Sequence, residues 1–151
     1  MLCRMFVSLL VIFATAIAVQ GECTDKSGYC EGDRCIRGNN GAALGEGQTL
    51  TSANGRYRLV MQYDGNLVIY CDRKYVNWDS RTHGIAIEGG LRFQSDGNLV
   101  LYKYGKQAVW NSKTYRSEAC RLVMQNDGNL VLYGCYGKVY WSTSTHGKCG
   151  R

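Results

Sequence analysis

An amide, a carboxylate, a second amide, an aliphatic side chain and a phenol occupy every second position of one short segment. These residues are Gln62, Asp64, Asn66, Val68 and Tyr70. Alternate side chains of an extended strand point to one face, so Asn66, Val68 and Tyr70 lie together, and the other two can join them across a hairpin. Amides and carboxylates pair with vicinal hydroxyls, and a valine covers an apolar C–H face. The set therefore suits a pyranose ring.

The same pattern occurs three times in the chain. The second copy begins 32 residues after the first, and the third begins 31 residues after the second. The further copies are Gln94, Asp96, Asn98, Val100 and Tyr102, and then Gln125, Asp127, Asn129, Val131 and Tyr133. Each glutamine is followed 16 residues later by one of the three tryptophans of the chain: Trp78, Trp110 and Trp141. Because the motif and its tryptophan recur together three times, the sequence indicates a threefold internal repeat.

Each repeat has the pattern of short strands joined by turns. Residues 59–61 and 67–70 are apolar or β-branched runs on either side of Asp64-Gly65, which predicts a β-hairpin. Further strands are expected around the three tryptophans, and no substantial helix is expected after residue 22. A repeat of about 31 residues cannot bury an apolar face alone. We therefore assign to one shared interior the tryptophans and Leu67, Ile69, Leu99, Leu101, Leu130 and Leu132.

Two other interpretations of the repeated polar residues are weaker. Asp-Gly-Asn is good turn chemistry in any β protein, but turn chemistry does not explain why glutamine, valine and tyrosine recur at fixed offsets. Catalysis is not expected, because His83 and His146 fall in equivalent loops of different repeats and the repeated carboxylates are dispersed. A scaffold of the three repeats that binds protein partners independently of sugar, as a toxin-like module would, remains the alternative function.

The first residues resemble a secretory leader. Arg4 precedes the apolar run 5–19, which is short for a membrane span and is followed by small residues, so cleavage is expected after Gly21. The mature chain is therefore expected to be secreted and not inserted in a membrane. Without Arg4, the 18 basic residues of the whole chain become 17 against 12 acidic ones, a net charge of +5. The basic residues are scattered singly, so nucleic acid is not an expected partner.

Seven of the eight cysteines lie beyond the leader. They are Cys23, Cys30, Cys35, Cys71, Cys120, Cys135 and Cys149. Secretion favours disulfide bonds, whereas the spacing does not favour zinc. An odd number leaves one thiol free or in a bridge between two chains, and the spacing alone does not assign the pairs.

The unbroken Gln-x-Asp-x-Asn-x-Val-x-Tyr motif with its tryptophan resembles the signature of the bulb-type (monocot-type, B-lectin) mannose-binding lectins. The resemblance covers roughly residues 41 to 147. It divides the chain into a signal peptide, residues 1–21, a cysteine-containing extension, residues 22–40, and a lectin domain of three repeats, residues 41–151. The implied fold is all-β, a β-prism II of three four-stranded antiparallel sheets in pseudo-threefold arrangement with one sugar site per sheet.

The resemblance also implies a role for each motif residue. In that family the aspartate and asparagine bind the axial O2 of mannose, the glutamine contacts O3, the tyrosine hydroxyl contacts O4, and the valine packs on ring carbons. All three copies carry the full set, so mannose-containing glycans and glycoproteins are the expected partners. Neither a metal nor another cofactor is expected, because the set consists of amides, phenols and one carboxylate per site. Defence is the expected biological role.

The chain departs from the family in its cysteines. The usual internal disulfide of the family would pair the Cys120 position with a residue that is Gly97 here, so Cys120 must have another partner. Cys135 and Cys149 are the alternatives. Related lectins often dimerise by exchanging C-terminal strands, and the odd cysteine offers a second route, so a homodimer is an expectation as well.

Overall fold

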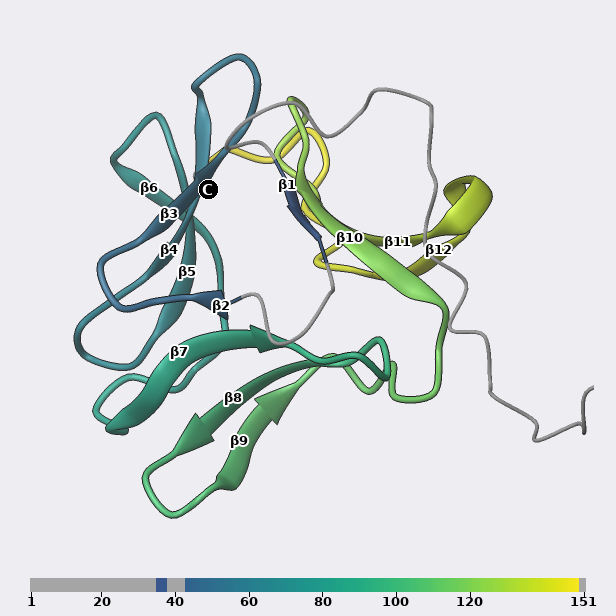
Figure 1. The fold of residues 1–151 in the computed structure, drawn as a ribbon. Helices are drawn as coiled ribbons and strands as arrows, with labels where there is room; N and C mark the ends of the chain where they lie inside the picture. The colour runs from purple at the N-terminus through teal and green to yellow at the C-terminus, as the bar shows by residue number, and fades with distance from the viewer. Residues whose placement is uncertain (1–34, 38–42, 150–151) are drawn as a thin grey trace, which may run out of the picture.

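The computed structural model describes residues 35–37 and 43–149, which form three antiparallel sheets of four strands each (Figure 1). The first repeat lies in the sheet of β3 (Thr49–Thr51), β4 (Tyr57–Met61), β5 (Leu67–Cys71) and β6 (Tyr75–Asp79). The second lies in the sheet of β2 (Ala43–Leu44), β7 (Ile87–Phe93), β8 (Leu99–Lys103) and β9 (Gln107–Asn111). The third lies in the sheet of β1 (Cys35–Arg37), β10 (Ala119–Met124), β11 (Leu130–Gly134) and β12 (Val139–Ser142). The prediction of three four-stranded sheets is confirmed.

One 3-10 turn, η2 (Cys135–Gly137), is the only helical element of the described residues. None of these residues belongs to a helix that is long and apolar enough to cross a membrane. The predicted leader and most of the predicted extension lie outside the described residues.

The first three strands each complete a different sheet. β1 pairs with β10, β2 pairs with β7 and β3 pairs with β4, so one N-terminal stretch of chain visits all three sheets in turn. β1 belongs to the segment that the sequence interpretation placed in an extension. At least these three residues therefore take part in the β-prism itself.

The shared interior is built from alternate residues of the middle strands. Leu67 and Ile69 of β5 are buried with their counterparts Leu99, Leu101, Leu130 and Leu132 of β8 and β11, as predicted. The three tryptophans are partly buried and pack against this core. Their rings meet edge to face, with centroids 5.7 to 6.1 Å apart. Aromatic pairs favour this geometry, so the tryptophans join the three sheets to one another.

The last strand of each sheet contains a β-bulge, which changes the face of the sheet to which its side chains point. In the first sheet Ile69 pairs with Trp78, whereas the next residue, Tyr70, pairs with Val76. The same register shift occurs between Leu101 and Tyr102 and between Leu132 and Tyr133. In a regular strand Val76 and Trp78 would share a face. The extra residue instead lets Trp78 face the core while Val76 lies beside Tyr70 on the outer surface.

The turn of each motif requires its glycine. Gly65 has a φ of +86°, which favours glycine, and a Cβ there would overlap the carbonyl oxygen of Ile85. Gly97 and Gly128 have φ values of +86° and +89° and meet Ser117 and the Tyr57 ring in the same way. Because each turn packs against a neighbouring segment, the glycine of the motif is explained by the fold alone.

A disulfide bond joins Cys71 at the end of β5 to Cys149 near the C-terminus, 78 residues later. Cys149 is therefore not the partner of Cys120, and that alternative is wrong. Cys120 is itself disulfide-bonded. The cross-link between Cys71 and Cys149 attaches the segment after the third repeat to the sheet of the first repeat.

Candidate functional site

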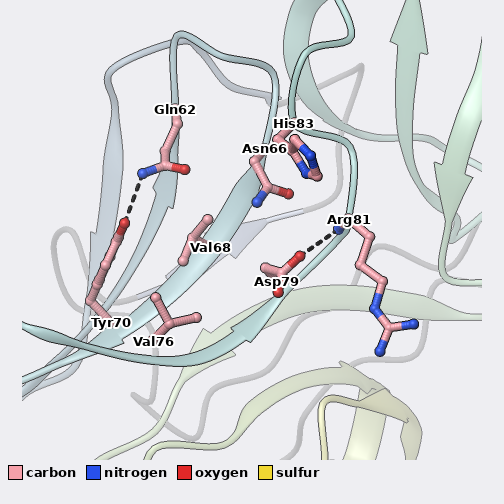
Figure 2. A pocket seen from close by; sticks show the side chains of 8 residues that line it. All are labelled: Gln62, Asn66, Val68, Tyr70, Val76, Asp79, Arg81 and His83. Carbon is pink, nitrogen blue, oxygen red and sulfur yellow. Dashed lines mark hydrogen bonds between the residues drawn. The ribbon is translucent and has the colours of Figure 1, made fainter. Parts of the chain in front are cut away.

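The motif residues gather on the outer face of each sheet, around the middle strand. In β5, Leu67 and Ile69 face the core, so Val68 and Tyr70 face outward, and Asn66 precedes them at the edge of the hairpin turn. Figure 2 shows Gln62, Asn66, Val68 and Tyr70 around one shallow pocket. The predicted Asp64 is exposed in the turn and is not among the residues that line this pocket.

A hydrogen bond orients the glutamine and the tyrosine. The Gln62 amide nitrogen donates to the Tyr70 hydroxyl over 2.8 Å, and the equivalent pairs lie 2.9 Å and 2.6 Å apart in the second and third sheets. Since the tyrosine oxygen accepts this bond, its own proton stays available to a ligand. The glutamine carbonyl oxygen is likewise left as an acceptor.

The aspartate caps the turn and supports the asparagine. The Asn66 backbone N–H donates to Asp64 Oδ1 over 2.9 Å, and the same bond measures 3.0 Å and 2.9 Å in the other two motifs. This is the short-range hydrogen bond typical of an Asx turn. One carboxylate oxygen is thus engaged while the second faces solvent, where a hydroxyl can donate to it.

The asparagine side chain is held by the loop that follows the tryptophan. Asn66 Oδ1 accepts from Ser80 Oγ at 3.0 Å and from the Thr82 backbone N–H at 3.1 Å. Equivalent donors contact Asn98 and Asn129, with the hydroxyl of Thr143 in place of a serine hydroxyl at Asn129. With the oxygen satisfied from behind, the amide nitrogen points into the pocket toward Val68 (Figure 2). It makes no hydrogen bond to another described residue and so forms a preoriented donor.

We expect Ser80→Ala to destabilise the fold and the site together. Ser80 Oγ accepts from the Leu67 backbone N–H and donates to Asn66 Oδ1, and both contacts are buried. Leaving buried polar groups without partners should lower the free energy of unfolding by about 1–3 kcal/mol. Urea denaturation of this variant measures the loss. Ser95→Ala, in an exposed turn position, is the control and should change stability by less than about 0.5 kcal/mol. Equal losses in both variants would contradict the role of Ser80.

A second wall of the pocket comes from β6 and the loop after it. Val76, Asp79, Arg81 and His83 line this side, and Figure 2 places His83 and Arg81 on the side of Asn66 that lies away from Gln62 and Tyr70. The sequence interpretation did not include these residues. Their fixed offsets from Trp78 were the available signal, because the repeat places a residue of some kind at the same offsets in every sheet.

The counterparts of this wall differ among the three sheets. The second sheet has Ala108, Asn111, Lys113 and Tyr115 at these positions, and the third has Val139, Ser142, Ser144 and His146. The backbone is the same, since Arg81, Lys113 and Ser144 have φ values of +58°, +59° and +55°. The three sites thus share one set of motif residues and differ in this second wall, whose outer edge at Arg81, Lys113 and Ser144 is called the rim below.

The described residues offer little for metal binding. Their one group with suitable spacing is Cys71, Asp72 and Cys149. Its two sulfurs are joined in the disulfide bond, which leaves a single carboxylate as a ligand.

Comparison with solved structures gave clear similarities. The chain is 31% identical to a lectin of Marasmius oreades, with a TM-score of 0.67, over 76% of this chain and 92% of that one. It is 35% identical to a monomeric monocot mannose-binding lectin of Gastrodia elata, with a TM-score of 0.64, over 75% and 98% of the two chains. It is 31% identical to the mannose-specific agglutinin of snowdrop, Galanthus nivalis, in complex with methyl-α-D-mannoside, with a TM-score of 0.56, over 75% and 97%. No protein-family model and no curated protein sequence matched the chain.

Proposed function

Because this chain belongs to the family of the bulb-type mannose-binding lectins, we propose that it binds mannose-type glycans through three equivalent sites, one on each sheet. The proposal includes secretion through the leader of residues 1–21 and a role in defence. The protein is a carbohydrate-binding protein and not an enzyme, as expected, since the similar structures are lectins.

One observation supports the proposal above the others. Each of the three sites presents the same groups with hydrogen-bonding capacity left over: an asparagine N–H, a glutamine carbonyl and a tyrosine hydroxyl around a buried valine, and an aspartate oxygen in the adjacent turn. Vicinal hydroxyls of a hexose both donate and accept, and the aliphatic floor suits its C–H face. The hydrogen bonds from Ser80 and Thr82 to Asn66, and the bond between Gln62 and Tyr70, hold these groups in place before a ligand arrives. This preorganisation reduces the entropy lost on binding.

A single sugar should bind weakly, because each site is shallow and open to solvent. A dissociation constant on the order of 1 mM corresponds to about 4 kcal/mol. Several sites that engage one branched glycan or one glycan-coated surface can raise the apparent affinity by roughly 10²- to 10⁴-fold through effective concentration. Useful binding therefore comes from multivalency.

A glycan array tests the proposal. The purified mature chain is expected to bind high-mannose structures, to release them in the presence of free mannose, and to ignore galactose-terminated glycans. Addition of a chelator should leave binding unchanged, because the proposed site consists of amides, a phenol and a carboxylate. Absence of binding to every mannose glycan would remove the proposed function while leaving the fold, and would favour the protein-binding scaffold.

A further inference from the structure

Each proposed sugar site has an arginine on the strand that leads into its motif. Arg58, Arg92 and Arg121 pair across the hairpin with Tyr70, Val100 and Tyr133. Each of these arginines adjoins a buried core leucine in sequence: Leu59, Leu91 and Leu122. Because side chains alternate along a strand, the arginines share the outer face with the motif residues. In the third sheet the Arg121 guanidinium lies 5.1 Å from the centre of the Tyr133 ring.

A second cation lies at the opposite rim of each site. Arg81 and Lys113 occupy equivalent positions in the first two sheets, and Ser144 takes this position in the third. In the third sheet Lys148 supplies the positive charge that Ser144 lacks, because its Nζ lies beside Ser144 and donates to the Ser144 carbonyl oxygen over 3.2 Å. A cation is thus present at this rim in all three sheets, although in the third it comes from a different residue.

These rim cations are not neutralised by the described residues. Arg81, Lys113 and Lys148 form no ion pair within residues 35–37 and 43–149. Asp79 Oδ1 accepts from the backbone N–H of Arg81 rather than from its guanidinium, and Asn111 Oδ1 accepts from that of Lys113. The charged ends of Arg81 and Lys113 therefore remain available to a ligand, and the Lys148 ammonium has two further N–H donors besides the one that contacts Ser144.

The balance of charge differs among the sites. At the rim of the first site, the carboxylate of Asp79 offsets the charge of Arg81. The second and third sites have Lys113 and Lys148 without this carboxylate, because Asn111 and Ser142 replace Asp79. The rims of these two sites therefore carry a net positive charge, whereas the rim of the first is balanced.

We propose that the second and third sites prefer mannose glycans that carry an anionic substituent, either phosphate or carboxylate. This inference rests on the proposed mannose binding and assigns a ligand class to two of its sites. The motif residues hold the pyranose, while Lys113 and Lys148 at the rim attract the negative group, joined in the second site by Arg92 on the strand side. The cations are exposed or half-buried, so the preference is modest and depends on salt.

The test compares two probes that differ only in charge: an oligomannoside with one phosphomonoester, and the same compound after phosphatase treatment. The wild-type chain should bind the phosphorylated probe about three- to tenfold more tightly at roughly 50 mM salt. The difference should disappear near 1 M salt, where the Debye length is only about 3 Å. A carboxylate-bearing mannoside, run in parallel, shows whether both kinds of anion are accepted.

The double variant Lys113→Gln/Lys148→Gln should bind the two probes equally. The matched control, Lys106→Gln/Lys138→Gln, removes the same charge from the same two sheets. Its lysines precede β9 and β12, roughly 20 Å along the strands from the rim, so the control should keep the preference. Loss of the preference in the control as well would overturn the assignment, because net charge alone would then explain it.

Two further results would count against the proposal in different ways. Equal affinity of the wild-type chain for both probes at low salt would overturn the preference for anionic glycans and leave mannose binding intact. Failure of the uncharged probe to bind at all, at concentrations well above 1 mM, would overturn mannose binding and this inference with it.

Discussion

Conversion of Asn66, Asn98 and Asn129 to aspartate is expected to abolish binding to mannose-coated surfaces. The substitution keeps the size of each side chain and the oxygen that accepts from the loop behind it. It replaces the N–H donor in the pocket by a second oxygen. The lost hydrogen bond and the acceptor placed in its position should weaken each site at least tenfold, or about 1.4 kcal/mol. Multivalent binding loses this factor at every site that engages the surface.

Single variants provide the internal control for this prediction. In an NMR or calorimetric titration with methyl mannoside, Asn66→Asp should remove one bound sugar and leave the sites around Asn98 and Asn129 as in the wild type. Thermal unfolding should change little, because the oxygen contacts behind the asparagine persist. Retention of full surface binding by the triple variant would contradict the assignment of these residues.

Removal of the Cys71–Cys149 bridge is expected to produce the largest loss of stability. The bond closes a loop of 78 residues, and cross-linking a loop of this length restricts the unfolded chain by roughly 4 kcal/mol. The variant Cys71→Ala/Cys149→Ala should therefore show a free energy of unfolding lower by about 2–5 kcal/mol in chemical denaturation without reductant. Sugar binding below the unfolding transition should persist, since Cys71 is buried in the core and neither cysteine lines the pocket of the first sheet.

Cys149→Ala alone separates the cross-link from side-chain packing. Cys71 is fully buried, whereas Cys149 is half-buried. The single variant breaks the bridge without removing the buried Cys71 sulfur, so it should account for most of the loss. A double variant as stable as the wild type would show that the bridge does not stabilise the fold.

The sequence predicts most of the fold because each of the three repeats carries the same alternation of core-facing and outward-facing residues. Leu67 and Ile69 alternate with Val68 and Tyr70, which predicts both a strand and its buried face, and the period predicts a shared core with the tryptophans. The Asp-Gly pair predicts the turn between β4 and β5. The structure shows why the turn needs glycine, because a side chain at Gly65 would overlap the carbonyl oxygen of Ile85. Short-range patterns are informative here since the last three strands of each sheet are consecutive in sequence.

Other features depend on contacts between distant residues. The pairing of β1 with β10 joins segments about 85 residues apart, and the bridge from Cys71 spans 78 residues. No local pattern specifies either of them. The bulge in β6 is equally hard to predict, although it decides that Val76 faces the site. For this reason Arg81 and His83, which follow the bulged strand, were not predicted to line the pocket.

The most direct test of three mannose sites is a crystal structure of the mature chain grown with methyl-α-D-mannoside. We expect a pyranose on each sheet, over Val68, Val100 and Val131, with one hydroxyl within hydrogen-bond distance of the asparagine nitrogen and another within reach of the tyrosine hydroxyl. Empty motif faces at saturating sugar, or a sugar bound only elsewhere on the surface, would contradict this expectation.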